Sequence, residues 1–147
     1  MIRLETLTDG RVEACARMYA QAYAQPPWNE THDLDKVEAY LRAFMRESAF
    51  HCYVLTRGGV AVAMALCIRI PYMDVFSLRV EDLCVAPQFQ RRGFGGKLLG
   101  MLRTEAARLG ADCVLLGTQR DFPAHAFYLK HGFTDVDGAA LMYCGVE

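Results

Sequence analysis

Apolar residues recur along this chain at two spacings, one typical of helices and one typical of strands. Intervals of three and four residues predict helices at 10–25, 33–45, 96–109 and 123–131. Alternating or continuous apolar runs predict strands at 2–4, 50–56, 60–70, 76–85, 113–117, 133–136 and 140–146. The order predicts a three-layer α/β domain, in which helices flank a mixed, mostly antiparallel sheet.

Residues that stop or start elements agree with this division. We expect Asp9 to cap the first helix, Pro26-Pro27 to end it, and Gly110 to end the third. Gly58-Gly59 lies between two apolar runs and predicts a hairpin. The run at 113–117 is short and apolar, as expected of a buried central strand. No linker or repeat interrupts the pattern, so we expect one domain over residues 1–147.

Composition and charge exclude several classes of protein. The net charge is −1 over 147 residues, which argues against a nucleic-acid binder that relies on positive charge. No apolar run approaches the roughly 20 residues that a membrane span needs. The first residues carry Arg3 and Glu5 and lack the apolar region of a signal peptide. We therefore expect a cytoplasmic protein with neither nucleic acid nor membrane as a partner.

The six cysteines and four histidines show no ligand spacing. No Cys-x-x-Cys occurs, and most of the cysteines lie within apolar runs. We expect reduced thiols in the core and no metal site.

The segment 90–97 combines glycines with cations at the start of a predicted helix. A helix N-terminus offers free N–H groups to an anion, and glycine lets the backbone approach it closely. The spacing excludes a P-loop, because Leu98 follows Gly96-Lys97 where Ser or Thr is required. Leu98 also occupies the third glycine position of a dinucleotide-binding fingerprint. From the residues alone, the segment remains an anion site or a mobile glycine-rich loop.

The surrounding sequence resembles the GNAT N-acetyltransferase superfamily. The run from Val80 to Gly95 is similar to the family element Gln/Arg-x-x-Gly-x-Gly/Ala and the strand before it. The run from Asp121 to Phe133 is similar to the family's Asn-x-x-Ala-x-x-Phe-Tyr-x-x-x-Gly-Phe, and the loop at 26–30 is similar to one found in some members. The resemblance spans nearly the whole chain and implies the GNAT-like acyl-CoA N-acyltransferase fold.

The resemblance implies acetyl-CoA as the donor and coenzyme A as the product. The last strand residues before the turn would pair with the pantetheine like an added strand, provided that this strand splays from the run at 113–117. Asp121 stands where the family has Asn, and a carboxylate accepts hydrogen bonds but cannot donate them. The residues expected at the cofactor are Leu83, Cys84, Val85, Gln90, Arg91, Arg92, Gly93, Phe94, Gly95, Gly96, Lys97, Asp121 and Tyr128.

The family's reaction is direct transfer of the acetyl group to a primary amine in a ternary complex. The amine must lose a proton, and the resemblance offers Glu81, then Asp82, as the base, acting directly or through water. Both carboxylates also fit a structural ion pair or a solvated strand. Tyr128 would hydrogen-bond the departing thiolate, because full proton transfer from a phenol to a thiolate is uphill by about 2 kcal/mol. Cys84 has no histidine beside it in sequence, so a covalent route is not favoured.

The resemblance implies that the acceptor is a primary amine of a small molecule or a peptide. Its pocket would be lined by the first two helices, the loop between them and the late strands. Aromatic rings with an acid could receive a cationic amine. The residues expected there are Tyr23, Trp28, Glu30 and Tyr72. The alternative function is a noncatalytic acyl-CoA-binding or sensor module, and the resemblance also allows for a homodimer.

Overall fold

The computed structural model describes residues 1–146. They divide into two compact units, Met1–Gly117 and the segment from Thr118 onward, and each is described by itself. The elements are β1 (Ile2–Thr6), α1 (Asp9–Tyr23), α2 (Leu34–Arg46), β2 (Phe50–Arg57), β3 (Val60–Tyr72), β4 (Val75–Val85), the 3-10 helix η1 (Pro87–Phe89), α3 (Phe94–Leu109), β5 (Cys113–Leu116) and α4 (Pro123–Lys130). Among these residues, no helix has both the length and the apolar composition needed to cross a membrane.

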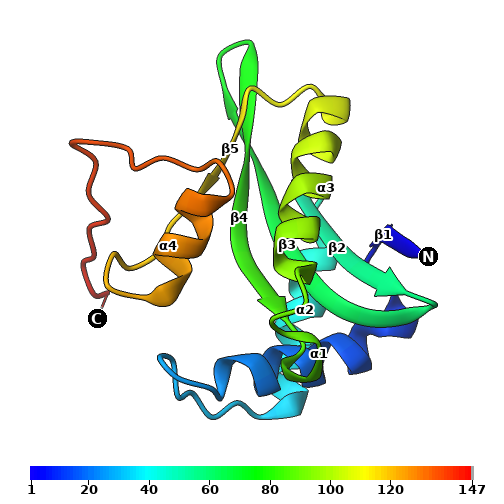
Figure 1. The fold of residues 1–147 in the computed structure, drawn as a ribbon. Coiled ribbons are helices and arrows are strands. Elements are labelled where there is room, and N and C mark those ends of the chain that lie inside the picture. The colour runs from blue at the N-terminus through cyan, green and yellow to red at the C-terminus, as the bar shows by residue number, and fades with distance from the viewer. Residues whose placement is uncertain (147) are drawn as a thin grey trace. The chain divides into compact units, whose positions relative to one another are not determined.

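A five-stranded sheet in the order β1-β2-β3-β4-β5 organises the first unit (Figure 1). The first three pairs are antiparallel, and β4 pairs with β5 in parallel. The predicted hairpin is present: Arg57 pairs with Val60, and Gly58 and Gly59 both have positive φ. A mixed, mostly antiparallel sheet flanked by helices is thereby confirmed.

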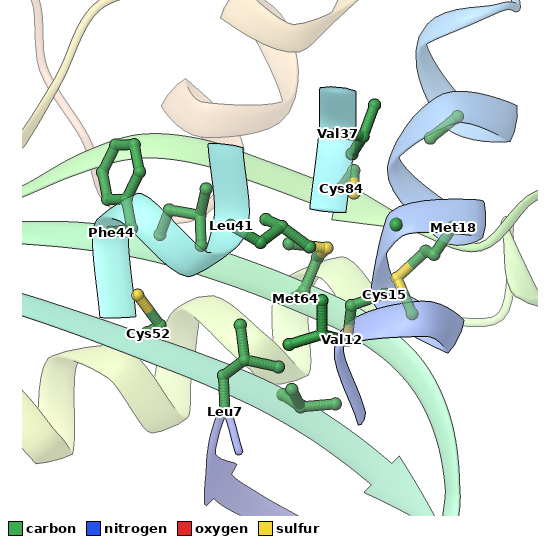
Figure 2. Packing of buried hydrophobic residues seen from close by; sticks show 14 of the residues in the cluster. Leu7, Val12, Cys15, Met18, Val37, Leu41, Phe44, Cys52, Met64 and Cys84 are labelled. Carbon is green, nitrogen blue, oxygen red and sulfur yellow. The ribbon is translucent and has the colours of Figure 1, made fainter. Parts of the chain in front are cut away.

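The sheet carries a separate apolar core on each face. On one face, α1 and α2 pack against alternate residues of β2 and β3, and Figure 2 shows Val12, Leu41, Cys52 and Met64 within this cluster. On the other face, the strand residues of opposite parity pack against α3, whose Leu98 and Leu102 are fully buried. Alternation of side chains along a strand therefore separates the first unit into three layers.

The helix starts agree only in part with the expected caps. Thr8, not Asp9, occupies the N-cap position of α1; Asp9 is already helical and pairs with Arg42 at 2.7 Å. Thr8 takes the cap position because its backbone is still extended, with φ −120° and ψ 165°. The α2 helix begins as expected, because the carboxylate of Asp33 accepts from the backbone N–H groups of residues 35 and 36.

The expectation of a buried central strand at 113–117 is wrong. The β5 strand has four residues, lies at the end of the sheet and alternates between exposed and half-buried positions. A strand with one neighbour, β4, covers less of its surface than a central strand does.

The two strands predicted at 133–136 and 140–146 are also absent, since residues 131–146 contain no helix or strand. Apolar residues favour a strand when their side chains pack against the surface of a sheet. Here Leu141, Met142 and Tyr143 are each at least 88% exposed, so this packing is missing. Within this second unit, Asp135 accepts from His125 at 2.7 Å and from Arg120 at 3.3 Å. This unit therefore consists of a short helix and two flanking segments, and Asp135 in the second segment contacts both the helix and the first segment.

Candidate active site

A bulge in β4 decides which face of the sheet its carboxylates occupy. Val80 lies opposite Cys67 and Asp82 lies opposite Leu66, so Glu81 is an extra residue without a partner in β3. One extra residue reverses the alternation of the strand beyond it. Val80 accordingly packs on the α3 face, and Cys84 packs on the face covered by α1 and α2. Asp82 shares that second face with Cys84, because side chains two residues apart along a strand point to the same side.

Beyond the bulge, β4 separates from β5, which is the splay expected between these two runs. The ladder between them ends at Val80 and Leu116, whereas β4 continues to Val85. The N–H of Ala86 donates to Val62 on β3 at 2.9 Å. Backbone groups of successive residues face opposite sides of a strand, so those of Leu83 and Val85 face the side where β5 has ended. This leaves a short open strand edge.

The open edge leads directly into a turn and the N-terminus of α3. Arg91 and Gly93 have positive φ, 62° and 83°, and α3 begins at Phe94, which is anchored in the core at 6% exposure. The first bond of the helix runs from the N–H of Lys97 to the carbonyl of Gly93 at 3.0 Å. The N–H groups of residues 94–96 precede it and have no acceptor within the helix.

Cations surround this helix end. Arg91, Arg92 and Lys97 are exposed, and the first turn of α3 carries no acidic residue. The guanidinium of Arg92 lies 5.8 Å from the centre of the Phe89 ring, which holds it beside the turn. Free N–H groups, the helix dipole and three cations together suit a densely charged anion.

Two tyrosine hydroxyls hold the carboxylate of Asp82. Tyr23, at the end of α1, donates to Oδ1 at 3.2 Å, and Tyr40, in α2, donates to Oδ2 at 2.5 Å. Burial raises the pKa of Asp82 above its usual value, and the two hydrogen bonds oppose this rise. Burial, together with the nearby Asp82, also raises the pKa of both tyrosines, so they remain protonated donors.

Glu81 has a different environment. Its carboxylate is 2.8 Å from the guanidinium of Arg79, and the residue is exposed. The neighbouring Cys84 is buried, and burial first, then the nearby Asp82, raises the pKa of its thiol. Such a thiol is a poor nucleophile, which agrees with the expectation that Cys84 does not carry a covalent route.

A pocket of about 180 Å³ opens between α1, α2 and the loop that joins them. It is lined by Tyr19, His32, Lys36, Val37 and Tyr40. Two expected acceptor residues contact its lining: Glu30 pairs with His32 at 2.8 Å, and the ring of Tyr23 lies 4.6 Å from that of Tyr19. Trp28 lies behind Tyr23, with 5.2 Å between the two ring centres.

Tyr40, His32 and Lys36 were not among the site residues expected from the sequence. Tyr40 follows Val37 by three residues and precedes Phe44 by four, so its spacing marks it only as part of the helix face toward the core.

Tyr72 is not brought to this pocket. It pairs with Val75 at the tip of the β3–β4 hairpin and is 71% exposed. Asp82 lies seven residues farther along β4 than Val75, a distance of about 23 Å for an extended strand.

Tyr128 and Asp121 belong to the second unit. Tyr128 is half-buried in α4, where its ring lies 5.4 Å from that of Phe127 and 5.6 Å from that of Phe133. Asp121 is exposed just before this helix.

Comparisons with known proteins identify the family to which the sequence belongs. The sequence matches the model of the Acetyltransferase (GNAT) family over residues 13–133. An uncharacterized protein of Mycobacterium leprae is 31% identical over 137 residues, covering 90% of this chain and 34% of that protein, so the chain spans about a third of this relative. An uncharacterized N-acetyltransferase of Bacillus subtilis is 25% identical over 122 residues, or 80% of each protein.

A solved structure agrees with this match at the level of the fold. The aminoglycoside N-acetyltransferase AAC(6')-Iy in complex with CoA has a TM-score of 0.78 and 14% identity to this chain, over 99% of this chain and 95% of that one. The chain belongs to the GNAT family of acetyltransferases.

Proposed function

We propose that this protein transfers an acetyl group from acetyl-CoA to a primary amine of a small molecule or a peptide, in a ternary complex. The observation that carries the proposal is the continuous segment 81–97. In it, an open strand edge leads into a cationic helix N-terminus. A pantetheine arm has peptide-like amides and ends on a pyrophosphate, so it matches an open edge followed by an anion site.

The residues of this segment fit such a donor. Arg91, Arg92 and Lys97 would neutralise the pyrophosphate, and the N–H groups of residues 94–96 would donate to it. Leu83 would pair with the pantetheine through its N–H, because the hydroxyl of Tyr23 lies 3.5 Å from its carbonyl oxygen. Val85 would do so through its N–H, because its carbonyl accepts from Gln90 at 3.0 Å. The donor supplies the acetyl thioester, and the remaining chemistry falls to side chains of this chain.

Asp82, rather than Glu81, is the base that we propose for the amine. A general base works best when its pKa lies near the working pH, and burial raises that of Asp82. Glu81 is exposed and paired with Arg79. Glu81 remains the alternative, acting through water. Tyr128 would donate a hydrogen bond to the departing sulfur, as the resemblance implies.

The acceptor would enter the pocket formed by Tyr19, His32, Lys36, Val37 and Tyr40. Tyr40 joins this pocket to the base, since its ring lines the pocket and its hydroxyl contacts Asp82. Glu30 and Tyr23 contact residues of its lining, and Trp28 packs against Tyr23. The size of the pocket favours a small group, such as an aminomethyl or an amino-acid side chain.

Release of thiol from acetyl-CoA tests the proposal. The purified protein is incubated with polyamines, aminoglycosides, amino acids and peptides, and free thiol is measured with and without each amine. Acetylation of at least one amine, shown by mass spectrometry, supports the function. A raised melting temperature in millimolar CoA without any amine-dependent release indicates the noncatalytic binding module instead. If CoA also fails to raise the melting temperature, the donor assignment is wrong.

A further inference from the structure

Tyr40 carries a role that neither the sequence motifs nor the family match assigns. We infer that Tyr40 is a positioning residue: it lines the acceptor pocket, and its hydroxyl fixes the orientation of the Asp82 carboxylate. The inference rests on the proposed function of Asp82 as the base.

The two oxygens of Asp82 are held by different helices. Tyr23 of α1 donates to Oδ1, and Tyr40 of α2 donates to Oδ2. A carboxylate held at one oxygen can rotate about its terminal torsion, whereas one held at both is fixed in its plane. Each oxygen still has a lone pair for the proton of an amine. The pair of hydroxyls therefore orients Asp82 without blocking it.

Packing of the Tyr40 ring holds its hydroxyl in place. The centre of this ring lies 5.0 Å from that of Phe44, edge-on, and 5.8 Å from that of Tyr19. The same ring forms a wall of the pocket of about 180 Å³. An acceptor in this pocket would contact the residue that orients the base, so substrate binding and base geometry are linked through one side chain.

The electrostatic surroundings make the hydroxyls important for the charge state of Asp82. The titratable groups that face it are Tyr19 and Tyr23 from α1, Tyr40 from α2, Glu30 from the α1–α2 loop, and Glu81 and Cys84 from β4. Among residues 1–146, no lysine, arginine or histidine forms an ion pair with Asp82. Hydrogen bonds from Tyr40 and Tyr23, with a further contact from the nearby hydroxyl of Tyr19, stabilise its charged form against burial and the two glutamates.

Removal of one hydroxyl has a defined consequence. In Tyr40→Phe, the ring packing remains and the hydrogen bond to Oδ2 is lost, so the pKa of Asp82 should rise. The rising limb of kcat/KM against pH should move to higher pH, and kcat/KM on that limb should fall about fivefold, the size expected for one net hydrogen bond. Tyr53→Phe is the matched control, because Tyr53 is a buried tyrosine that packs on the α3 face of the sheet.

Two readouts separate this inference from the proposed function. The first is the pH profile of acetylation for the wild type and both variants. The second is the ¹³C titration of the Asp82 carboxyl in the free protein, which needs no substrate. The inference is supported if the pH profile and the Asp82 titration both move to higher pH in Tyr40→Phe while neither moves in Tyr53→Phe. An unmoved titration overturns it, and so does a moved titration with an unmoved profile.

If no amine is acetylated, the proposed function fails, and the titration alone decides whether Tyr40 orients Asp82. If Tyr40→Phe does not fold, 3-fluorotyrosine at position 40 keeps the shape and makes the hydroxyl a stronger donor. The Asp82 titration should then move to lower pH, and a titration that stays in place overturns the inference.

Discussion

Gln90 folds back onto the end of β4, where its Nε2 donates a 3.0 Å hydrogen bond to the carbonyl oxygen of Val85. This bond ties the start of the turn to the strand from which the turn departs. This bond therefore acts together with the buried ring of Phe94 to set the position of the α3 N-terminus relative to the open strand edge.

Gln90→Ala should weaken binding of CoA about fivefold, because a typical net hydrogen bond contributes about 1 kcal/mol. Isothermal titration calorimetry measures the Kd. Gln88→Ala is the control, since Gln88 is exposed in η1 and two residues away. Equal affinities for Gln90→Ala and the wild type would show that the turn keeps its place without this bond.

Gly93 and Gly100 form a matched pair at the start and in the interior of α3. A Cβ added at either position meets no heavy atom within 4 Å, but only Gly93 has a positive φ, 83°. Gly93→Ala should lower the free energy of unfolding by about 1–2 kcal/mol, because an L residue is strained there. Gly100→Ala should raise it by about 0.5–1 kcal/mol, since alanine favours the helix.

Urea denaturation of both variants measures these opposite changes. Stabilisation by Gly93→Ala would mean that the turn is not held in the left-handed conformation in solution.

Most elements up to residue 130 were predictable because strong local signals bound them. Gly58-Gly59 forms the hairpin turn, Gly110 ends α3 with φ 89°, and Pro123 begins α4. Each of these residues has a backbone preference that neighbouring sequence does not change.

The bulge at Glu81 was not predictable, because it exists only in the register of β4 against β3. No residue of the run 75–85 departs from a strand pattern in a way that marks position 81. The contact between Tyr40 and Asp82 joins residues 42 positions apart, so it too depends on the fold. The sequence favours Glu81 as the base, and the pair of carboxylates is visible in it, but the environment that favours Asp82 depends on the bulge and on Tyr40.

Tyr128→Phe should lower turnover by about 100-fold or more while CoA affinity stays nearly constant, because a hydrogen bond to the developing thiolate acts mainly in the transition state. Steady-state kinetics and calorimetry check the two quantities. Tyr143→Phe is the control, since Tyr143 is 93% exposed in the same unit. An unchanged turnover in Tyr128→Phe would remove this residue from the mechanism.

Asp82 should also give stability a pH dependence of known sign. Its pKa is raised on folding, chiefly by burial, so the folded state holds the proton more tightly than the unfolded state, whose carboxyl titrates near pH 4. The free energy of unfolding should therefore fall as pH rises from about 4 through the raised folded pKa, and then level off. Asp82→Asn lacks this fall, so its stability relative to the wild type should increase over the same window. Urea denaturation at a series of pH values measures the difference, and Asp74→Asn, in the exposed hairpin turn, controls for the loss of one negative charge. A difference that stays constant across this window, or decreases, would mean that Asp82 is solvated as in the unfolded chain and is not the buried carboxylate that the proposed base requires.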